Sequence, residues 1–252
     1  MIIDAPRYDD IPALRSLWKE AFGDGEEFID AFFSAAFSPD RARCAKENDD
    51  VIAMLYWFDC EHDGERVAYL YAVATAKAYQ GRGVCSALME NTHRHLMEKG
   101  YTGALLVPGT AELFGFYDKF GYKTSCYVRE FSASASAGGL DMRKIGKEEY
   151  RELRQGFLPP DSVIQERENL DFLNTQASFY TGEGFLLAAR REGDALFGVE
   201  LLGNSDRAAE IVGAFGLERG KFRTPGREKP FSMYKPLKEE KTPPTYFGLA
   251  FD

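Results

Sequence analysis

The sequence predicts an α/β protein, in which buried strands alternate with amphipathic helices. Its 252 residues are 44% hydrophobic and 14% aromatic, which is enough apolar material for one large core or two ordinary ones. The run from Ala68 to Val73 is apolar and rich in β-forming residues, so it predicts a buried strand. A glycine-rich turn at residues 80–83 follows (the glycine turn), and Val84, Leu88 and Leu96 then recur at helical spacing.

The charge and the cysteines exclude several classes of protein. Acidic residues outnumber basic ones by 40 to 31, a net charge of −9, which disfavours nucleic acid as a partner and mildly favours a cationic acceptor such as an amine. No apolar run is long enough to cross a membrane, and the first ten residues lack the basic start of a secretory signal. We expect a cytoplasmic protein with reduced thiols and no metal site, because no C-x-x-C pair occurs among Cys44, Cys60, Cys85 and Cys126.

The strand, the glycine turn and the start of the helix together predict a phosphate-binding site. Glycines let an anion approach main-chain N–H groups, and the positive end of the helix dipole attracts it. The nucleotide triphosphate motif G-x-x-x-x-G-K-[ST] is absent. The dinucleotide motif G-x-G-x-x-G also fails, because Ser86 replaces its third glycine and no acidic residue stands about twenty positions later, at Gly103 to Leu105.

A third phosphate-binding pattern fits these residues. The segment Gln80-Gly81-Arg82-Gly83-Val84-Cys85 resembles the Q/R-x-x-G-x-G/A motif of the GNAT superfamily of N-acetyltransferases, with Cys85 in place of the usual Gly or Ala. After the helix, Ala104 to Val107 predicts a second short buried strand. A further helix is expected from Ala111 to Phe120, and Gly121 is a natural stop for it.

The end of that helix adds to the resemblance. The segment FYDKFGY is similar to the Y-x-K-x-G-F/Y motif that closes the GNAT domain, and Tyr117 takes the position of the tyrosine in that motif. Thr110 and Leu113 stand where many members have Asn and Ala. The resemblance extends from Met1 to Arg129, and it implies a mixed, mostly antiparallel twisted sheet flanked by helices.

The resemblance also implies a ligand and a reaction. Acetyl-CoA would be the acyl donor, and a primary amine of a small molecule or a peptide would attack its thioester directly. The strands Leu70 to Thr75 and Ala104 to Val107 would separate to admit the pantetheine arm, and the N–H near Val73 would polarise the thioester carbonyl. Arg82 can add a positive charge for the pyrophosphate. The cofactor-binding residues implied are Val73, Thr75, Gln80, Gly81, Arg82, Gly83, Val84, Cys85 and Ser86.

The catalytic residues are less clearly marked. Tyr117 is the candidate general acid, because a phenol with a reference pKa of about 10 can return a proton to the leaving thiolate; the alternative is a core tyrosine. Val67 stands where some members of the family hold a glutamate base. Glu61 or Asp59, acting through water, and the C-terminal carboxylate of Asp252 are the remaining candidate bases, the last by analogy with the enhanced intracellular survival proteins of the superfamily.

The second half of the chain repeats features of the first. Residues 145–157 resemble residues 7–22, and the expected hairpin at 191–202 resembles the one at 47–58. No second glycine turn follows the later hairpin. We therefore expect a GNAT domain at 1–131, a small-residue linker at 132–139 and a degenerate, smaller GNAT-like α/β domain at 140–252, a tandem arrangement known in the superfamily. The apolar last segment, 241–252, is expected to dock onto the body of the protein.

Other interpretations stay open at this stage. The acyl donor could carry a longer chain than acetyl. A non-catalytic acyl-CoA-binding or regulatory module is favoured by Cys85 in the glycine turn motif and by the missing strand carboxylate, although Tyr117 argues against it. The sequence identifies neither the acceptor nor the oligomeric state, and a homodimer is left open. One aromatic stripe either lines an acceptor pocket or belongs to the core: Phe28, Phe32, Phe33 and Phe37.

Overall fold

The computed structural model describes residues 1–238 and 241–251, and the chain forms two compact units. Neither unit is continuous in sequence. Unit 1 consists of Met1–Leu106, Gly115–Lys123 and Tyr234–Thr242, and unit 2 of Val107–Phe114, Thr124–Met233 and Pro243–Asp252. The domain limits 1–131, 132–139 and 140–252 stay a prediction. Ser132 to Ser134, which we expected in the linker, are the last residues of a long strand, β6 (Lys123–Ser134).

Unit 1 is built on a sheet with the order β1-β2-β3-β4-β5. Its neighbours pair antiparallel except β4 and β5, which are parallel. The long β3–β4 hairpin turns at Asp63 and Gly64, both with positive φ, as a two-residue hairpin requires. The strands are β1 (Ile2–Asp4), β2 (Ala42–Glu47), β3 (Asp50–His62), β4 (Glu65–Thr75) and β5 (Gly103–Leu106).

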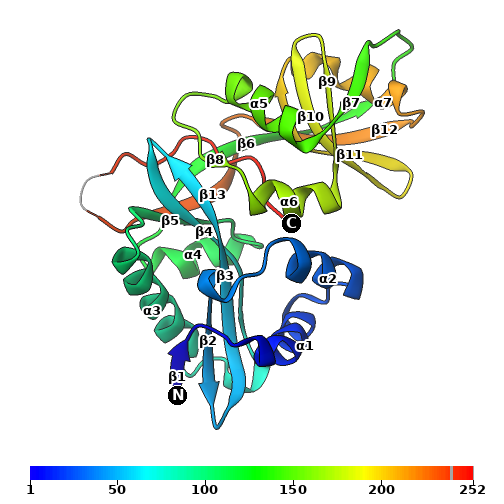
Figure 1. The fold of residues 1–252 in the computed structure, drawn as a ribbon. Coiled ribbons are helices and arrows are strands. Elements are labelled where there is room, and N and C mark those ends of the chain that lie inside the picture. Colours follow the sequence, from blue (N-terminus) through cyan, green and yellow to red (C-terminus); the bar gives the residue numbers. More distant parts are fainter. Residues whose placement is uncertain (239–240, 252) are drawn as a thin grey trace. The chain divides into compact units, whose positions relative to one another are not determined.

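Helices cover both faces of this sheet. The helices α1 (Ile11–Phe22) and α2 (Glu26–Ala35) lie on one side, and α3 (Val84–Glu98) lies on the other (Figure 1). α4 (Ala111–Asp118) follows β5, and its residues from Gly115 onward belong to unit 1. Short 3-10 turns occur at Tyr8–Asp10, Pro39–Arg41 and Lys77–Tyr79.

Aromatic rings fill the space between α1, α2 and the sheet. Trp18 is 1% exposed, and its ring centroid lies 4.7 Å from that of Phe32 and 5.6 Å from that of Tyr56. Its indole Nε1 donates a 2.8 Å hydrogen bond to Asp24. Phe32 is therefore a core residue, whereas the other members of the predicted stripe are half-buried: Phe28, Phe33 and Phe37. Ring pairs of this kind add to the burial energy that holds α2 in place.

Unit 2 has a sheet with the order β13-β6-β12-β11-β10-β9-β7. From β6 to β7 the pairs are antiparallel except β11 and β12, which are parallel. The strands are β6, β7 (Met142–Ile145), β9 (Ser178–Gly182), β10 (Phe185–Glu192), β11 (Ala195–Gly203), β12 (Arg219–Pro225) and β13 (Lys229–Pro236), with β8 (Ile164–Gln165) apart from them in this unit. The helices are α5 (Lys147–Phe157), α6 (Glu168–Gln176), the 3-10 turn Ser205–Arg207 and α7 (Ala208–Ala214).

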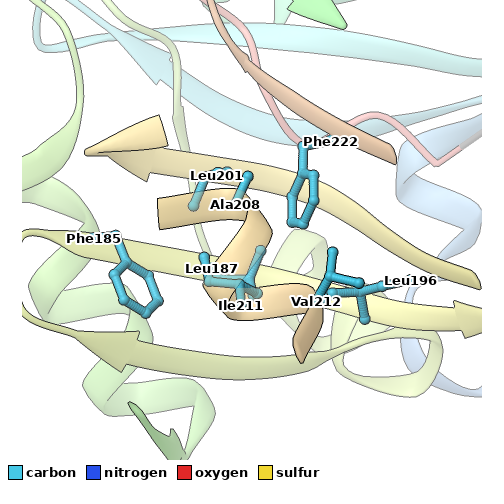
Figure 2. Packing of buried hydrophobic residues seen from close by; sticks show 9 residues of the cluster. Phe185, Leu187, Leu196, Leu201, Ala208, Ile211, Val212 and Phe222 are labelled. Carbon is cyan, nitrogen blue, oxygen red and sulfur yellow. The ribbon is translucent and has the colours of Figure 1, made fainter. Parts of the chain in front are cut away.

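The core of unit 2 lies between α7 and one face of this sheet (Figure 2). Ile211 and Val212 of α7 are fully buried against apolar side chains from three neighbouring strands: Phe185, Leu187, Leu196, Leu201 and Phe222. Side chains alternate along a strand, so Glu200, next to Leu201, points to the opposite face. There it meets Arg154 of α5, which places α5 on the face away from α7.

The two units repeat one order of elements. In unit 1 a strand, two helices, three antiparallel strands, a helix and a parallel strand follow one another, from β1 to β5. In unit 2, apart from the two-residue β8, the same succession runs from β7 through α5, α6, β9, β10, β11 and α7 to β12. The fifth strand is parallel to the fourth in each unit. This shared order extends the similarity that the sequence showed only in two short segments.

The apolar last segment docks, as expected, and the residues from Pro243 onward belong to unit 2. All residues from Tyr246 to Phe251 are buried, and those with a side chain are at most 8% exposed. Val163 N donates to Tyr246 O at 2.9 Å, and Gln165 exchanges side-chain hydrogen bonds with both main-chain groups of Leu249. Because the segment is held by main-chain and side-chain bonds, it needs no regular strand to be fixed.

Candidate active site

A β-bulge interrupts the pairing of β3 and β4. Tyr56 faces Tyr71 and Met54 faces Ala74, so Leu55 alone stands opposite both Ala72 and Val73. Ala72 has φ +47°, a left-handed conformation that a non-glycine residue adopts only when its surroundings impose it. A bulge leaves an extra residue outside the regular ladder and redirects its main-chain groups. Ala72 and Val73 therefore lie at an interruption of the regular β3–β4 ladder.

The part of β4 that carries the bulge is also not paired with β5. The parallel pairing with β5 covers Val67, Ala68 and Tyr69, and its last pair joins Tyr69 to Leu105. β4 continues to Thr75, whereas β5 ends at Leu106. The sequence predicted separated strands at Leu70 to Thr75 and Ala104 to Val107. In the structure the separation begins after Leu105, since Ala104 still pairs with Ala68.

The glycine turn presents open main chain to solvent. Gly81 and Gly83 have φ values of +73° and +78°, and a Cβ atom built on either would meet no atom within 4 Å. Glycine is therefore needed for the conformation and not for space. All four residues of the turn are exposed. Arg82 lies with its guanidinium 5.3 Å from the centre of the Tyr79 ring.

The helix α3 begins without a side-chain cap. Gly83 is its N-cap residue and has no side chain that could accept from the first-turn N–H groups. Cys85, at the departure from the family motif, does not disturb this start, since Ala87 N donates normally to Gly83 O at 3.0 Å. Burial raises the pKa of the Cys85 thiol, and Thr75 offsets only part of this rise. The thiol is therefore neutral at pH 7. The N-terminus of α3 is thus free to receive an anion.

Tyr117 is held in a largely apolar setting at the end of α4. Its side chain is 7% exposed, and its ring stands at 69° to that of Tyr122 with 6.1 Å between centroids. Burial, and to a smaller extent the neighbouring Cys85, raise the pKa of Tyr117 well above its ordinary value. The phenol is therefore protonated at neutral pH, which is the form that a general acid requires.

The matched family fits this geometry. Residues 3–125 match the family model of the acetyltransferase (GNAT) domain. The chain therefore carries the acetyltransferase (GNAT) domain over residues 3–125, and this match supports acyltransferase activity. The limits of the match agree with the resemblance between Met1 and Arg129. Among curated proteins, none matches the sequence.

Solved structures share the fold of the GNAT domain and of most of the remaining chain. A GCN5-related N-acetyltransferase from Anabaena variabilis superposes with a TM-score of 0.75 at 15% identity, over 94% of this chain and 73% of that one. One from Kribbella flavida gives 0.70 at 16% identity, over 93% and 70%. Eis1 from Mycobacterium abscessus gives 0.69 at 12% identity, over 94% and 74%. The predicted fold class, a mixed and mostly antiparallel sheet flanked by helices, is confirmed.

One contact of the GNAT domain was missed from the sequence. His93 of α3 and Tyr122 are joined by a 2.7 Å hydrogen bond between the imidazole Nε2 and the phenol, and both are buried. Burial and the nearby charge of Lys235 lower the pKa of His93 to about 4. No local signal joins two residues 29 positions apart.

Of the candidate bases, Glu61 and Asp59 do not lie at the bulge. Val67 is fully buried in the strand, as its apolar side chain requires. Glu61 pairs with Arg66, five residues before Tyr71, which is about 16 Å along a strand. Asp59 lies nearer but is engaged by Tyr101 and Arg66. Asp252 lies outside the described residues.

The described residues hold neither a metal-binding cluster nor a membrane-spanning helix. Within residues 1–238 and 241–251, no group of three or more His, Cys, Asp and Glu side chains is arranged to hold a metal ion. No helix in the same residues is long and apolar enough to span a membrane.

Proposed function

We propose that the protein transfers an acetyl group from acetyl-CoA to a primary amine. The observation that carries this proposal is the combination on β4 of the bulge at Ala72 and the loss of pairing with β5 after Tyr69. It leaves main-chain N–H groups next to an opening in the sheet, and the glycine turn with the uncapped start of α3 follows directly. A thioester ligand with a pyrophosphate at its other end matches these two features.

The donor would be held along β4 and the start of α3. The pyrophosphate accepts hydrogen bonds from the main-chain N–H groups of Gly81, Arg82, Gly83, Val84, Cys85 and Ser86, with the guanidinium of Arg82 adding positive charge. Gln80 shapes this turn, because its Nε2 donates a 3.1 Å hydrogen bond to Thr75 O. The N–H of Val73 donates to the thioester carbonyl and stabilises the negative charge that develops there.

The reaction would proceed by direct attack. The lone pair of the neutral amine forms a bond to the thioester carbonyl carbon, and the C–S bond then breaks. Tyr117 donates its proton to the sulfur, the amine loses a proton to solvent, and tyrosinate regains one. The products are an N-acetylated amine and CoA. Burial has raised the pKa of Tyr117 further above that of an ordinary thiol, so the proton transfer from the phenol to the thiolate is uphill. It is completed because the tyrosinate regains a proton from solvent.

The acceptor is inferred from the cost of making the amine neutral. A lysine-like amine with a pKa of about 10.4 costs roughly 4–5 kcal/mol to deprotonate at pH 7, whereas an α-amine near 7.8 costs about 1 kcal/mol. No candidate carboxylate lies at the bulge among the described residues. We therefore favour a small molecule or peptide with a weakly basic amine. Glu61 and Asp252 stay predictions as bases, and the cytoplasm stays the predicted location.

We further propose that unit 2 is a degenerate GNAT-like domain. Its repeat of the element order supports this, and so does a second bulge, where Ala188 faces Glu200 and Ala189 faces Gly198. The extra residue, Val199, lies on the strand before the parallel partner, as Ala72 does in unit 1. In unit 2, however, Thr224 donates a 2.7 Å hydrogen bond to Leu201 O across the two parallel strands, and no glycine turn follows.

The test is to follow free thiol while the protein is incubated with acetyl-CoA and a panel of amines. We expect thiol release by the wild type and about a 100-fold or larger loss in Tyr117→Phe, with unchanged CoA affinity by calorimetry. Tyr8→Phe, at an exposed tyrosine, is the matched control and should behave as wild type. Tight CoA binding without turnover by the wild type would instead support the non-catalytic acyl-CoA-binding module.

A further inference from the structure

One side chain from outside the glycine turn holds the segment that leads into it. Glu20, on α1, accepts a 2.8 Å hydrogen bond from the main-chain N–H of Lys77 at its Oε1. Lys77 is the first residue of the 3-10 turn Lys77–Tyr79, and Gln80 follows that turn at once. The two partners are 57 residues apart in sequence, so this contact exists only in the folded unit.

The other bonds of this segment are local or come from the sheet. Ala76 N donates to Ile52 O at 2.9 Å, which continues the pairing with β3. Tyr79 N donates to Ala76 O and Gln80 N to Lys77 O, within the turn itself. Together with the bond from Gln80 to Thr75, these fix the turn to the end of β4. Among the described contacts of this segment, the bond from Lys77 N to Glu20 is the one that joins it to a helix.

The helix that carries Glu20 is anchored by its buried face. Leu14, Leu17 and Trp18 of α1 are at most 4% exposed, and Trp18 is further held by its bond to Asp24. Glu20 extends from this rigid base, although its own side chain is exposed. A ligand that binds a preorganised loop does not lose the entropy of ordering it. The bond to Lys77 N therefore acts on ligand affinity rather than on chemistry.

We propose that Glu20 is a positioning residue for the coenzyme A site, acting through the main chain of Lys77. This inference rests on the proposed function, because it takes the glycine turn to be the pyrophosphate site. Glu20 does not touch the ligand in this proposal. Its negative charge is unfavourable for a nearby pyrophosphate, so the net benefit comes from the hydrogen bond and not from the charge.

This opposition of charge and hydrogen bond allows a sharp test with two variants. Glu20→Ala removes both the charge and the acceptor atom, whereas Glu20→Gln removes the charge and keeps an oxygen that can accept from Lys77 N. We expect CoA binding by calorimetry to weaken about three- to tenfold in Glu20→Ala and to stay at the wild-type value or tighten slightly in Glu20→Gln. In turnover, KM for acetyl-CoA should rise in Glu20→Ala with kcat unchanged.

A second readout needs no ligand. Hydrogen exchange of peptides covering residues 76–83, measured on the full chain without CoA, should be faster in Glu20→Ala and unchanged in Glu20→Gln. Glu27→Ala removes the same charge from an exposed position on α2 and should change neither exchange nor affinity. Equal affinity and exchange in wild type and Glu20→Ala would overturn the inference and leave the proposed function intact. A wild type that binds no CoA would overturn the proposed function, and this inference with it.

Discussion

Burial sets the protonation state of the titratable residues around the candidate site. Tyr117 is kept as a phenol, Cys85 as a thiol and His93 as a neutral imidazole, each because the charged form would have to leave water. The neutral His93 and the Tyr122 hydroxyl can then share one hydrogen bond without a buried charge.

His93 gives the protein a defined loss of stability in acid. Folded His93 has a pKa of about 4, whereas an unfolded histidine has one near 6.5, so between these values only the unfolded chain binds the proton. Its stabilising effect is therefore complete above pH 6.5 and is lost as the pH falls towards 4. At pH 4.5 the loss from this residue should be about 2–3 kcal/mol. Urea unfolding of wild type and His93→Gln at pH 7 and 4.5 measures it, and an equal pH dependence in both would contradict it.

At the scale of elements, the site depends on two interruptions of regular structure. The bulge at Ala72 takes main-chain groups out of the β3–β4 ladder, and the glycine turn replaces a side-chain cap on α3. Regular pairing at either place would satisfy the N–H groups internally and leave nothing for a ligand. In the proposed function, the ligand therefore binds where the secondary structure of the GNAT domain is incomplete.

Replacing Gly83 should separate the role of conformation from that of space. Gly83→Ala introduces no clash, but a left-handed alanine costs about 1–2 kcal/mol, so we expect lower stability and weaker CoA binding. Gly115→Ala is the matched control, because Gly115 lies inside α4 with open space at its Cβ position. That change should stabilise by about 0.5–1 kcal/mol. Thermal unfolding and calorimetry with CoA measure both, and equal stabilities for the two variants would refute the argument.

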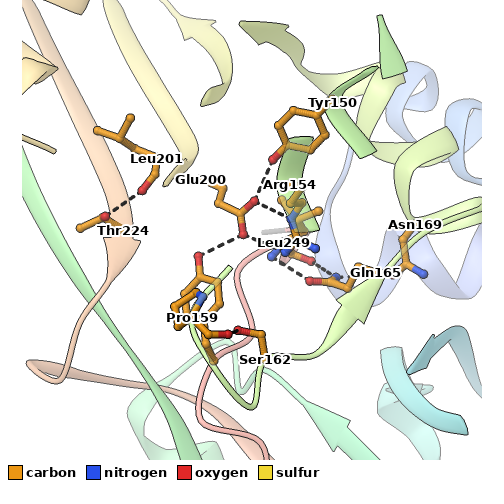
Figure 3. A network of polar contacts seen from close by, with 11 residues as sticks. Tyr150, Arg154, Pro159, Ser162, Gln165, Asn169, Glu200, Leu201, Thr224 and Leu249 are labelled. Carbon is orange, nitrogen blue, oxygen red and sulfur yellow. Dashed lines mark hydrogen bonds and ion pairs between the residues drawn. The ribbon is translucent and has the colours of Figure 1, made fainter. Parts of the chain in front are cut away.

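At the scale of the whole molecule, the last segment of the chain is buried in unit 2 beside Glu200, on the face of the sheet opposite the core against α7. Figure 3 shows the network that seats it: Glu200 accepts from Arg154 Nε at 2.7 Å and from Arg154 Nη2 at 2.9 Å, and Tyr150 donates to it as well. Tyr150 and Arg154 Nε donate to Oε2 of Glu200, whereas Arg154 Nη2 donates to Oε1. Tyr246 also donates to Oε1, at 3.0 Å. A Cβ at Gly248 would collide with Glu200 and Tyr246, so glycine lets the segment pass closely.

Breaking this ion pair should be far more costly than losing the tyrosine bond. Burial alone would raise the pKa of Glu200, but Arg154 more than offsets this and keeps the carboxylate ionised. Glu200→Gln leaves Arg154 as a buried unpaired charge and should cost about 3–5 kcal/mol of unfolding free energy. Tyr246→Phe removes one hydrogen bond and should cost about 1–3 kcal/mol. Denaturant unfolding measures the loss of unfolding free energy in both variants, and Glu192→Gln, at the exposed ion pair with Arg190, is the control. A larger loss in Tyr246→Phe than in Glu200→Gln would contradict the role given to the Arg154–Glu200 ion pair.

The sequence alone determined the strand, the glycine turn and the helix, because these depend on local spacing and on residues such as Gly81 and Gly83 whose conformation few others adopt. It also predicted the fold class, the closing motif around Tyr117 and the docking of the last segment, whose aromatic residues could not stay in water. The repeat of the two halves was visible only in short segments, since topology is kept by burial patterns rather than by residue identity.

Only the tertiary structure decided the rest, because these features join residues that are distant in the chain. The bulge at Ala72 depends on the register of β3, and the link between Glu20 and Lys77 depends on where α1 packs. His93 meets Tyr122, and Arg154 meets Glu200, through burial that no local pattern encodes. The distance of Glu61 from the bulge likewise follows from strand register, which the sequence around it does not fix.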